Sequence, residues 1–413
     1  MKVSIAACLS AMLLLPLLVT GSAFGQEEED KRLEFEGYAV INYLNYNWQT
    51  DSVRRANVDV ERLAFEVEYK LTDRIRLEAE VEFEHGGTGS TMEFDKFEEF
   101  GEYEQEIEQG GEVVLEKVAA EILIVPEFNV RLGHFYVPVG RLNSDYEPND
   151  YFTTQRSEAE VNIIPGVWHE TGIGVFGDVG PLRYQAVLVN GLDATGFSSA
   201  MWIVRGHQTK FEMANAENLA VAGRLDYRFM PELEVSVSGY FGNSADNRPK
   251  PDLNVPAHVG IGEMHVDYNA GPLTLRGLAL YGTLQNAAAV SRANRSLSNN
   301  LNAKRTPVGS AALGWFVEAG YDVLSFLSPK AAGDASWLPE LDLFARYDFY
   351  DTMYKVDAGI FDNPRWERTV WTGGINYRLA PGFVLKGQYS HRALGLSADN
   401  IEDTFSLGLG AQL

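Results

Sequence analysis

The chain has 413 residues, of which 45% are hydrophobic and 12% aromatic, so it can bury a large apolar surface. This composition excludes a disordered or collagen-like protein. Its 34 Lys and Arg residues stand against 58 Asp and Glu residues, and the resulting net charge of −24 excludes a nucleic-acid partner held by phosphate neutralisation.

The first element along the chain is expected to be a cleaved signal peptide over residues 1–25. Lys2 supplies a positive start, residues 5–19 form an apolar stretch, and Ala23-Phe24-Gly25 places small residues at the cleavage point. The single cysteine, Cys8, would leave with this segment. The remaining domain, residues 26–413, would then hold no thiol for a disulfide, a zinc site or a nucleophile.

The next feature is strict alternation of apolar and charged residues, which predicts β-strands. From Ile75 to Glu84 every second residue is apolar and the others are charged, over a length that suits a tilted strand crossing a bilayer. Similar stretches follow along the chain, and about sixteen can be counted, an even number typical of bacterial outer-membrane barrels. The faces are mixed in the predicted strands near 35–48, 112–125 and 169–177.

The connections between these segments alternate in length. Short turns at 71–74, 178–180, 230–232, 269–272 and 380–382 take turns with long polar stretches at 85–111, 138–167, 191–218, 243–257 and 285–307, and 325–339 is an exception. We therefore predict an all-β fold, a transmembrane antiparallel β-barrel of about 16 strands with short periplasmic turns and long extracellular loops. A secreted sandwich or solenoid is the alternative.

Aromatic residues gather at the predicted strand ends, for instance Tyr46 with Trp48, Phe349 with Tyr350, and Trp366. Girdles of aromatic residues at the two membrane interfaces would explain these positions. Ordinary core packing in a soluble sandwich would place nearly as many aromatic residues there. The aromatic residues therefore support the barrel prediction without deciding it.

Several segments carry a resemblance to a known family. The stretches 131–143, 165–172, 182–191, 314–322, 344–348 and 384–389 are similar to the phosphate-selective porin O and P family of bacterial outer-membrane proteins. The resemblance implies a sixteen-stranded diffusion channel that assembles as a homotrimer. The chain ends in Leu413 where such proteins usually carry an aromatic residue, and it lacks a clear match to the basic ladder of the phosphate-specific members, so the broad family is implied rather than phosphate selectivity.

Motifs for enzymatic chemistry are weak. The glycine pattern Gly172–Gly177 lies in a predicted strand followed by a turn, with no helix to receive a pyrophosphate, so it favours a structural role. His169-Glu170 lacks the second histidine of a zinc protease helix, and the seven histidines have no metal-ligand spacing. No catalytic, cofactor-binding or metal-binding residue is predicted, and no cofactor is implied.

Three loops have functional interpretations. The stretch 93–112 holds Glu98, Glu99, Glu102, Glu104, Glu106 and Glu108 and could attract cations or contact lipopolysaccharide, while 292–305, with Arg292, Arg295, Lys304 and Arg305, could steer anions. A solvated loop is the simpler interpretation of both. The stretch 138–166 is the candidate constriction loop, in which opposed charges would narrow a pore, with Arg141, Asp145, Glu147, Asp150, Arg156, Glu158 and Glu160.

These features predict a porin of the bacterial outer membrane, a water-filled channel for passive diffusion of small hydrophilic solutes or ions, surrounded by outer-membrane lipid and lipopolysaccharide. In each predicted strand the residues that alternate with the apolar face would point into the barrel. The charged residues at these inward positions are predicted to line the pore, namely Arg62, Arg76, Glu78, Glu80, Arg224, Arg228, Arg276, Arg346, Arg378, Lys386 and Arg392. The arginines come from many strands and the acids concentrate near 66–84, so an anion preference is a hypothesis. A non-conducting structural or adhesive barrel and a barrel-embedded hydrolase are the alternatives.

Overall fold

The computed structural model describes residues 32–95, 104–144, 147–208, 214–297, 305–326 and 339–412, with the side chains of 88–110 left undescribed. The predicted signal peptide, Asp145, Lys304 and Leu413 therefore lie outside the described residues. The same holds for Glu98, Glu99 and Glu102 and for the side chains of Glu104, Glu106 and Glu108.

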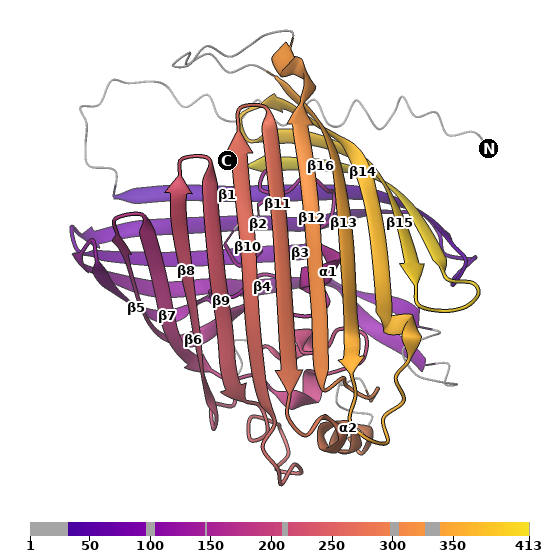
Figure 1. Ribbon diagram of the computed structural model, residues 1–413. Helices are drawn as coiled ribbons and strands as arrows, with labels where there is room; N and C mark the ends of the chain where they lie inside the picture. The colour runs from indigo at the N-terminus through magenta and orange to yellow at the C-terminus, as the bar shows by residue number, and fades with distance from the viewer. Residues whose placement is uncertain are drawn as a thin grey trace.

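The prediction of an antiparallel barrel of about sixteen strands is confirmed. Each strand pairs with its neighbours in sequence, and β1 pairs with β16 to close the barrel (Figure 1). The strands are β1 (Leu33–Trp48), β2 (Asn57–Thr72), β3 (Ile75–Asp95), β4 (Glu104–Val125), β5 (Phe128–Tyr136), β6 (His169–Val179), β7 (Leu182–Asn190), β8 (Leu219–Met230), β9 (Leu233–Asn243), β10 (His258–Ala270), β11 (Leu273–Leu284), β12 (Ala311–Asp322), β13 (Glu340–Lys355), β14 (Glu367–Ala380), β15 (Phe383–Leu394) and β16 (Ile401–Gln412).

Helical elements are short and lie in the connections. They are α1 (Glu158–Val161), α2 (Ala287–Arg295) and the 3₁₀ turns η3 (Ala194–Gly196), η4 (Val204–Gly206), η5 (Val323–Phe326) and η6 (Pro364–Trp366). No helix among the described residues is long and apolar enough to cross a membrane. The described strands pair with one another around the whole barrel, so most of the backbone hydrogen bonds are made between strands.

Register follows from the alternation seen in the sequence. Phe65 of β2 lies opposite Val81 of β3 on the outer face, and Glu66 lies opposite Glu80 on the inner face. Two facing carboxylates would repel each other. Lys117 of β4 compensates, with its Nζ 2.5 Å from a Glu66 oxygen and 3.8 Å from a Glu80 oxygen. A shift of one residue would move these charges to the outer face, so the register is strongly determined.

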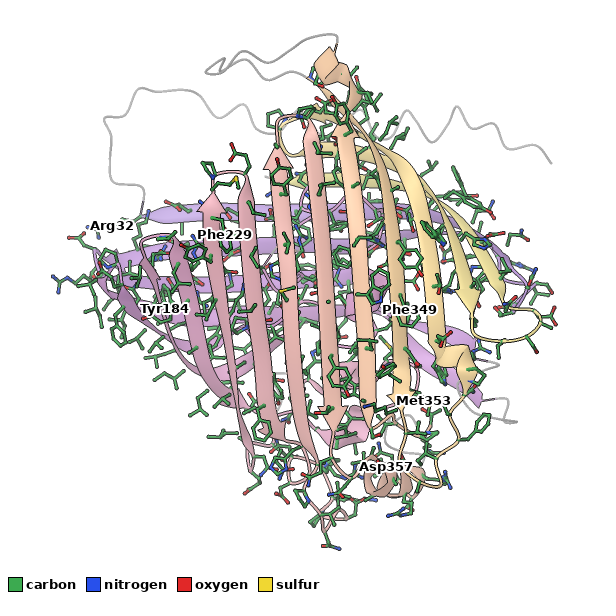
Figure 2. The ribbon with its side chains drawn as sticks, in the orientation of Figure 1. Arg32, Tyr184, Phe229, Phe349, Met353 and Asp357 are labelled. Carbon is green, nitrogen blue, oxygen red and sulfur yellow. The ribbon has the colours of Figure 1, made fainter. Side chains whose placement is uncertain are left out.

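The two ends of the barrel differ, as the sequence predicted. Short turns join β8 to β9 and β10 to β11 at the end drawn uppermost in Figure 1, which we call the turn end. Long connections, including the one that forms α2, lie at the opposite loop end, and Asp357 lies there beside α2 (Figure 2). The Asp357 carboxylate accepts a hydrogen bond of 2.9 Å from the backbone N–H of Ala288, which favours the helix N-terminus.

The long connection predicted at 85–111 is wrong over most of its length. β3 and β4, which are 21 and 22 residues long, continue through it as a two-stranded ribbon after β2 stops pairing at Glu84. The polar and glycine-rich sequence resembles a loop, and Gly86 and Gly87 have positive φ values of 78° and 91°. The register of the β3–β4 pair shifts between Glu84 and Gly89 and then resumes, so these glycines form an irregularity within the ribbon.

The predicted aromatic girdle is wrong at four of its named positions. Tyr46 and Trp48 line a cavity inside the barrel, and Tyr350 and Trp366 are buried. In β1 the inward residues include Tyr38, Val40 and Asn42, and Tyr46 and Trp48 have the same parity. Tyr46, Trp48 and Tyr350 therefore belong to the barrel interior, whereas Trp366 of η6 packs in an apolar cluster with Ala200 and Met353.

Candidate constriction site

The connection between β5 and β6, residues 137–168, folds into the barrel, and we call it the inner loop. Its buried apolar residues join a cluster with side chains from the 191–218 connection and the wall, including Ile163, Trp168, Phe197 and Trp202. Glycines on the inner face of β12 and β16 make room for the inner loop, because a Cβ there would overlap or crowd it: Gly314 faces Ala159, Gly320 faces Phe152, Gly408 faces Thr154 and Gly410 faces Pro148.

Wall side chains hold the tip of the inner loop by its backbone. The Nζ of Lys386 in β15 donates to the carbonyl oxygens of Tyr151 at 2.7 Å and Thr153 at 3.0 Å. The Oε1 of Gln388 accepts from the backbone N–H of Thr154 at 2.8 Å. The Lys386 ammonium also lies 4.0 Å from the ring centroid of Tyr151. The tip is therefore fixed by directed hydrogen bonds and a cation–π contact.

Phe152 at this tip is the apolar anchor. Its ring stacks on Phe344 of β13 with centroids 5.6 Å apart and an interplanar angle of 11°. The guanidinium carbon of Arg276 lies 4.7 Å from the Phe152 centroid. Gly320 leaves the space that the ring occupies. Because Phe152 is buried against both an aromatic ring and a guanidinium, we expect this contact to contribute strongly to the free energy of loop docking.

The next residues of the inner loop are held by charge. Glu158 accepts from Arg392 at 2.9 Å and from the hydroxyl of Tyr350 at 2.6 Å. Burial raises the pKa of Glu158, but Arg392 and the two hydrogen bonds outweigh it and hold the pKa below its usual value. The hydroxyl of Ser157 donates to Asp348 at 2.7 Å. This part of the inner loop is thus tied to β13 and β15 by an ionised carboxylate.

The base of the inner loop lies on a buried polar network of β8 to β10. Arg224 donates to the carbonyl oxygen of Gly140 at 3.0 Å and contacts the Nε2 of His265 at 3.1 Å, and the Nδ1 of His265 lies 2.7 Å from Glu263. Because the arginine can only donate, His265 accepts at Nε2 and donates at Nδ1. Ser238 completes the network, donating to Glu263 at 2.5 Å and accepting from the Gly140 N–H at 3.1 Å.

Glu160 is a carboxylate of the inner loop whose burial predicts a pH effect on loop docking. Its Oε1 accepts from the Leu142 N–H at 2.8 Å, while its Oε2 is buried and has no hydrogen-bond partner among the described residues. Burial raises the pKa of Glu160 to about 7, so the neutral acid is favoured in the docked loop. Above the pKa of the undocked carboxyl, about 4.3, rising pH favours undocking, by roughly 3 kcal/mol once pH exceeds 7.

Hydrogen exchange of the inner loop, corrected for intrinsic rates, should therefore show weaker protection at about pH 8 than at about pH 5. Glu160→Gln keeps the oxygen that accepts from Leu142 and should remove this difference near residues 140–142 and 158–161. Glu147 also has a pKa near 7, raised by burial and Asp150, but it contacts Gln412 at the turn end. A pH difference that persists near Leu142 in Glu160→Gln would contradict the assignment.

The structure places the other predicted pore-lining residues on the inner face, and most are paired. Carboxylate partners lie beside every arginine of the set: Arg62 with Glu82 and Glu84, Arg76 with Glu68 and Glu121, Arg224 with Asp226, Arg228 with Glu234, Arg276 with Glu318, Arg346 with Asp348, Arg378 with Asp342, and Arg392 with Glu402. Glu78 and Glu80 share Lys117. Their role in lining an open pore stays a proposal.

The expectation that inward acids concentrate near 66–84 is wrong. Buried acids of the inner face also come from β4, β10, β12, β13 and β16, namely Glu116, Glu121, Glu263, Glu318, Asp342, Asp348 and Glu402. Most of the arginines that the alternation placed inside therefore meet an acid from a neighbouring strand, while Arg224 pairs with Asp226 of its own strand. The paired arginines contribute little net charge to the interior, because opposite charges at ion-pair distance cancel at longer range.

Cavities lie on the two sides of the inner loop. The outer cavity, about 220 Å³, is lined by Trp48, Arg54, Arg156, Arg346 and Arg392 among others. A cavity of about 290 Å³ on the turn side includes Arg141, Asp150, Arg228 and Arg276. The inner loop contributes Arg156 and Glu158 to the first and Arg141 and Asp150 to the second. It therefore lies between two polar spaces of the barrel.

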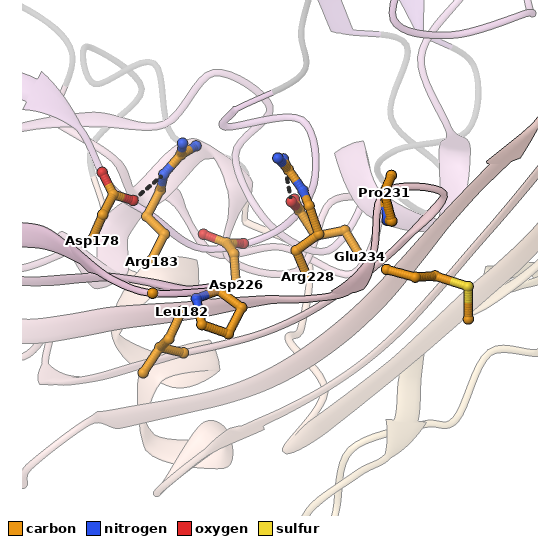
Figure 3. A pocket seen from close by; sticks show the side chains of 10 residues that line it. Asp178, Leu182, Arg183, Asp226, Arg228, Pro231 and Glu234 are labelled. Carbon is orange, nitrogen blue, oxygen red and sulfur yellow. Dashed lines mark hydrogen bonds and ion pairs between the residues drawn. The ribbon is translucent and has the colours of Figure 1, made fainter.

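A third cavity of about 380 Å³ lies at the turns that follow β6 and β8 (Figure 3). Asp178 pairs with Arg183 at 3.1 Å, and Arg228 pairs with Glu234 at 2.9 Å. These pairs are largely exposed, so each contributes about 1 kcal/mol or less. The predicted strand-and-turn role of Gly172–Gly177 is confirmed, because this segment lies within β6 and leads into the turn that follows Val179.

Histidines are gathered more than the sequence suggested. His134 Nε2 lies 2.6 Å from His169 Nδ1, and the rings of His169 and His207 are 6.2 Å apart. Within the described residues no group of three His, Cys, Asp or Glu side chains is arranged to hold a metal ion. Burial lowers the pKa of His207 to about 4, which keeps this imidazole neutral. Sequence analysis also missed Arg54 and His265, although His265 has the same parity as Glu263 and could have been placed inside on that ground.

Comparison with known proteins supports the fold. No family model matches the chain. An uncharacterized protein of Aquifex aeolicus (strain VF5) is 27% identical over 364 residues, which cover 87% of this chain and 75% of that protein. An anion-selective porin from Comamonas acidovorans is 13% identical with a TM-score of 0.54, covering 92% of this chain and 99% of that one. OmpT, an outer membrane protein of Vibrio cholerae in a trimer form, is 10% identical with a TM-score of 0.50, covering 92% and 99%.

These likenesses show that the chain has the fold of outer-membrane porins. They do not extend to the specific phosphate-selective O and P family, so that resemblance stays a prediction. The identities of the two solved structures are far below the level at which a solute or a residue's role carries over. Function has to be argued from the interior of this barrel.

Proposed function

We propose that the chain is a porin of the bacterial outer membrane, exported by the signal peptide 1–25, that passes small hydrophilic solutes or ions by passive diffusion. The observation that carries the proposal is a closed barrel of sixteen strands whose interior is polar and whose inner loop lies between two cavities. A barrel of this size leaves room for an aqueous path narrowed by a loop. Selectivity would follow from the width and the field at that narrowing.

We further propose an anion preference and a homotrimer. The likeness to an anion-selective porin and to a trimeric outer membrane protein supports both, at the level of the fold. Within the barrel, the outer cavity is lined by four arginines and two glutamates. Local charge at the narrowing, rather than the net charge of the whole chain, decides which ions pass.

A non-conducting barrel is the second candidate, and one observation favours it. Apolar side chains of the inner loop and of the 191–218 connection form a cluster inside the barrel, with Trp202 donating from Nε1 to the carbonyl oxygen of Gly309 at 2.9 Å. Trp202 also occupies the space beside Gly282. Such packing reduces the room left for a channel and would suit a structural or adhesive barrel.

Planar-bilayer recording under a KCl gradient tests the proposal. Purified, folded protein should give single-channel steps with a reversal potential that favours chloride over potassium. Heat-unfolded protein in the same detergent is the control for detergent artefacts. A reversal potential that favours potassium would overturn the anion preference, and an absence of steps from folded protein would establish the non-conducting barrel instead.

A further inference from the structure

The connection between β1 and β2, residues 49–56, places the side chain of Arg54 at the outer cavity. Tyr46 and Trp48 at the end of β1 face this cavity, and their rings form an edge contact with centroids 5.2 Å apart. The guanidinium carbon of Arg54 lies 4.4 Å from each of the two ring centroids. Trp48 is itself fixed, because its Nε1 donates to Thr404 at 3.0 Å. Arg54 therefore has a defined position although it is exposed.

A second guanidinium contacts the same indole. Arg392 lies 4.6 Å from the Trp48 centroid, but its charge is balanced by Glu402 and by Glu158 of the inner loop. Arg346, also at the outer cavity, has Asp348 at 2.7 Å. The aromatic contact thus brings Arg54 next to cations that are already paired.

Arg54 differs from the arginines that the alternation placed inside the barrel. Among the described residues it has no carboxylate within ion-pair distance, and its contacts through the side chain are with the two rings. A ring quadrupole orients a guanidinium without neutralising it and leaves its N–H donors available. The unit charge of Arg54 therefore acts on the solution in the outer cavity, within a Debye length of about 8–10 Å.

We propose that Arg54 is the residue that selects small anions at the outer cavity, ahead of the ion-paired arginines at the inner loop. This inference deepens the proposed porin function and rests on it. Holding the guanidinium against Tyr46 and Trp48 before an ion arrives lowers the entropic cost of each encounter. Trp48 is then a positioning residue, which acts through Arg54.

Charge-neutral substitution at Arg54 tests the proposal, and the chain offers a matched control. Arg55 carries the same charge in the same connection but does not line the outer cavity. Arg54→Gln should lower the chloride-to-potassium permeability ratio by about threefold, and Arg54→Glu should lower it further. Arg55→Gln should change it by less than about 1.3-fold. Trp48→Leu should give an intermediate value. Equal shifts in Arg54→Gln and Arg55→Gln, or no shift in either, would overturn the proposal.

A second measurement works without conduction, so that failure of the porin proposal and failure of this inference are distinguishable. The fluorescence of Trp48 is obtained as the difference between a protein with Trp48 and the same protein with Trp48→Phe. Iodide should quench this Trp48 fluorescence about twofold more strongly in the wild type than in Arg54→Gln, because Arg54 attracts the anion. Quenching by neutral acrylamide should be the same in both. Equal iodide quenching in the wild type and Arg54→Gln would overturn the role of Arg54 even if the protein conducts.

Discussion

Gly320→Val is expected to release the tip of the inner loop from the wall and to increase single-channel conductance. A Cβ at position 320 would occupy the ring position of Phe152, which is buried between Phe344 and Arg276. The strand cannot move away, because β12 is paired on both sides with β11 and β13. Phe152 must therefore leave its site, at a cost of about 3–5 kcal/mol, the range for removing a buried aromatic side chain.

The expected result has a readout that does not depend on conduction. Arg156 is buried in the docked loop with 6% of its surface exposed, so trypsin should not cut there in the wild type. In Gly320→Val the inner loop should be cut at Arg156 while the barrel stays folded. Gly262→Val is the matched control, because Gly262 lies in β10 and no atom of the described residues lies within 4 Å of an added Cβ. Protection of Arg156 and an unchanged conductance in Gly320→Val would contradict the assignment of Phe152 as an anchor.

The wall of the barrel follows from local sequence, because a residue's face is set by its parity within a strand. The strict alternation at 75–84 determined both the strand and the inward position of Glu78 and Glu80, and the pairing with β2 has the register that keeps those charges inside. The mixed faces of β1 have a physical reason. Val40 and Leu44 face an interior that the inner loop fills, so apolar residues occur on both faces of that strand.

The interior could not be predicted in the same way, because its contacts join residues far apart in sequence. Alternation along β16 puts Gly408 and Gly410 on the inner face, but nothing local shows that these positions are small to admit Thr154 and Pro148. Likewise most inward arginines, such as Arg62 with Glu82 and Arg276 with Glu318, find their partner on a neighbouring strand, so the pairing depends on register. Tyr46 and Trp48 lie four and six residues after the inward Asn42 in the same strand. Their inward position could therefore have been predicted from the alternation alone.

Lys386→Met is expected to detach the same loop by a different route. The ammonium of Lys386 is the donor to two buried carbonyl oxygens, those of Tyr151 and Thr153. Methionine matches the length of the lysine stem and cannot donate, so both carbonyl groups would lose their donor. Each unsatisfied buried acceptor costs about 1–3 kcal/mol, which predicts about 2–6 kcal/mol of lost docking free energy.

Lys386→Met also has a stabilising effect, which acts on the folded barrel rather than on the docking of the loop. Lys386 is buried, and no carboxylate among the described residues lies within ion-pair distance of its Nζ. Replacing an unpaired buried ammonium by an apolar side chain of similar shape removes a desolvation cost, so the thermal stability of the barrel should fall little or even rise. Lys386→Met should therefore weaken loop docking strongly while barrel stability changes little, whereas a general packing defect would lower both.

Hydrogen exchange and thermal unfolding together test this separation. In Lys386→Met the amides of residues 150–156 should exchange at least about tenfold faster, since each 1.4 kcal/mol of docking free energy is a factor of ten. The midpoint of barrel unfolding should stay within a few degrees of the wild type. Lys355→Met, at the loop end of β13 with its Nζ near the Tyr354 ring, is the control and should alter neither quantity. Unchanged exchange at 150–156, or a large fall in the unfolding midpoint, would show that Lys386 does not fix the inner loop.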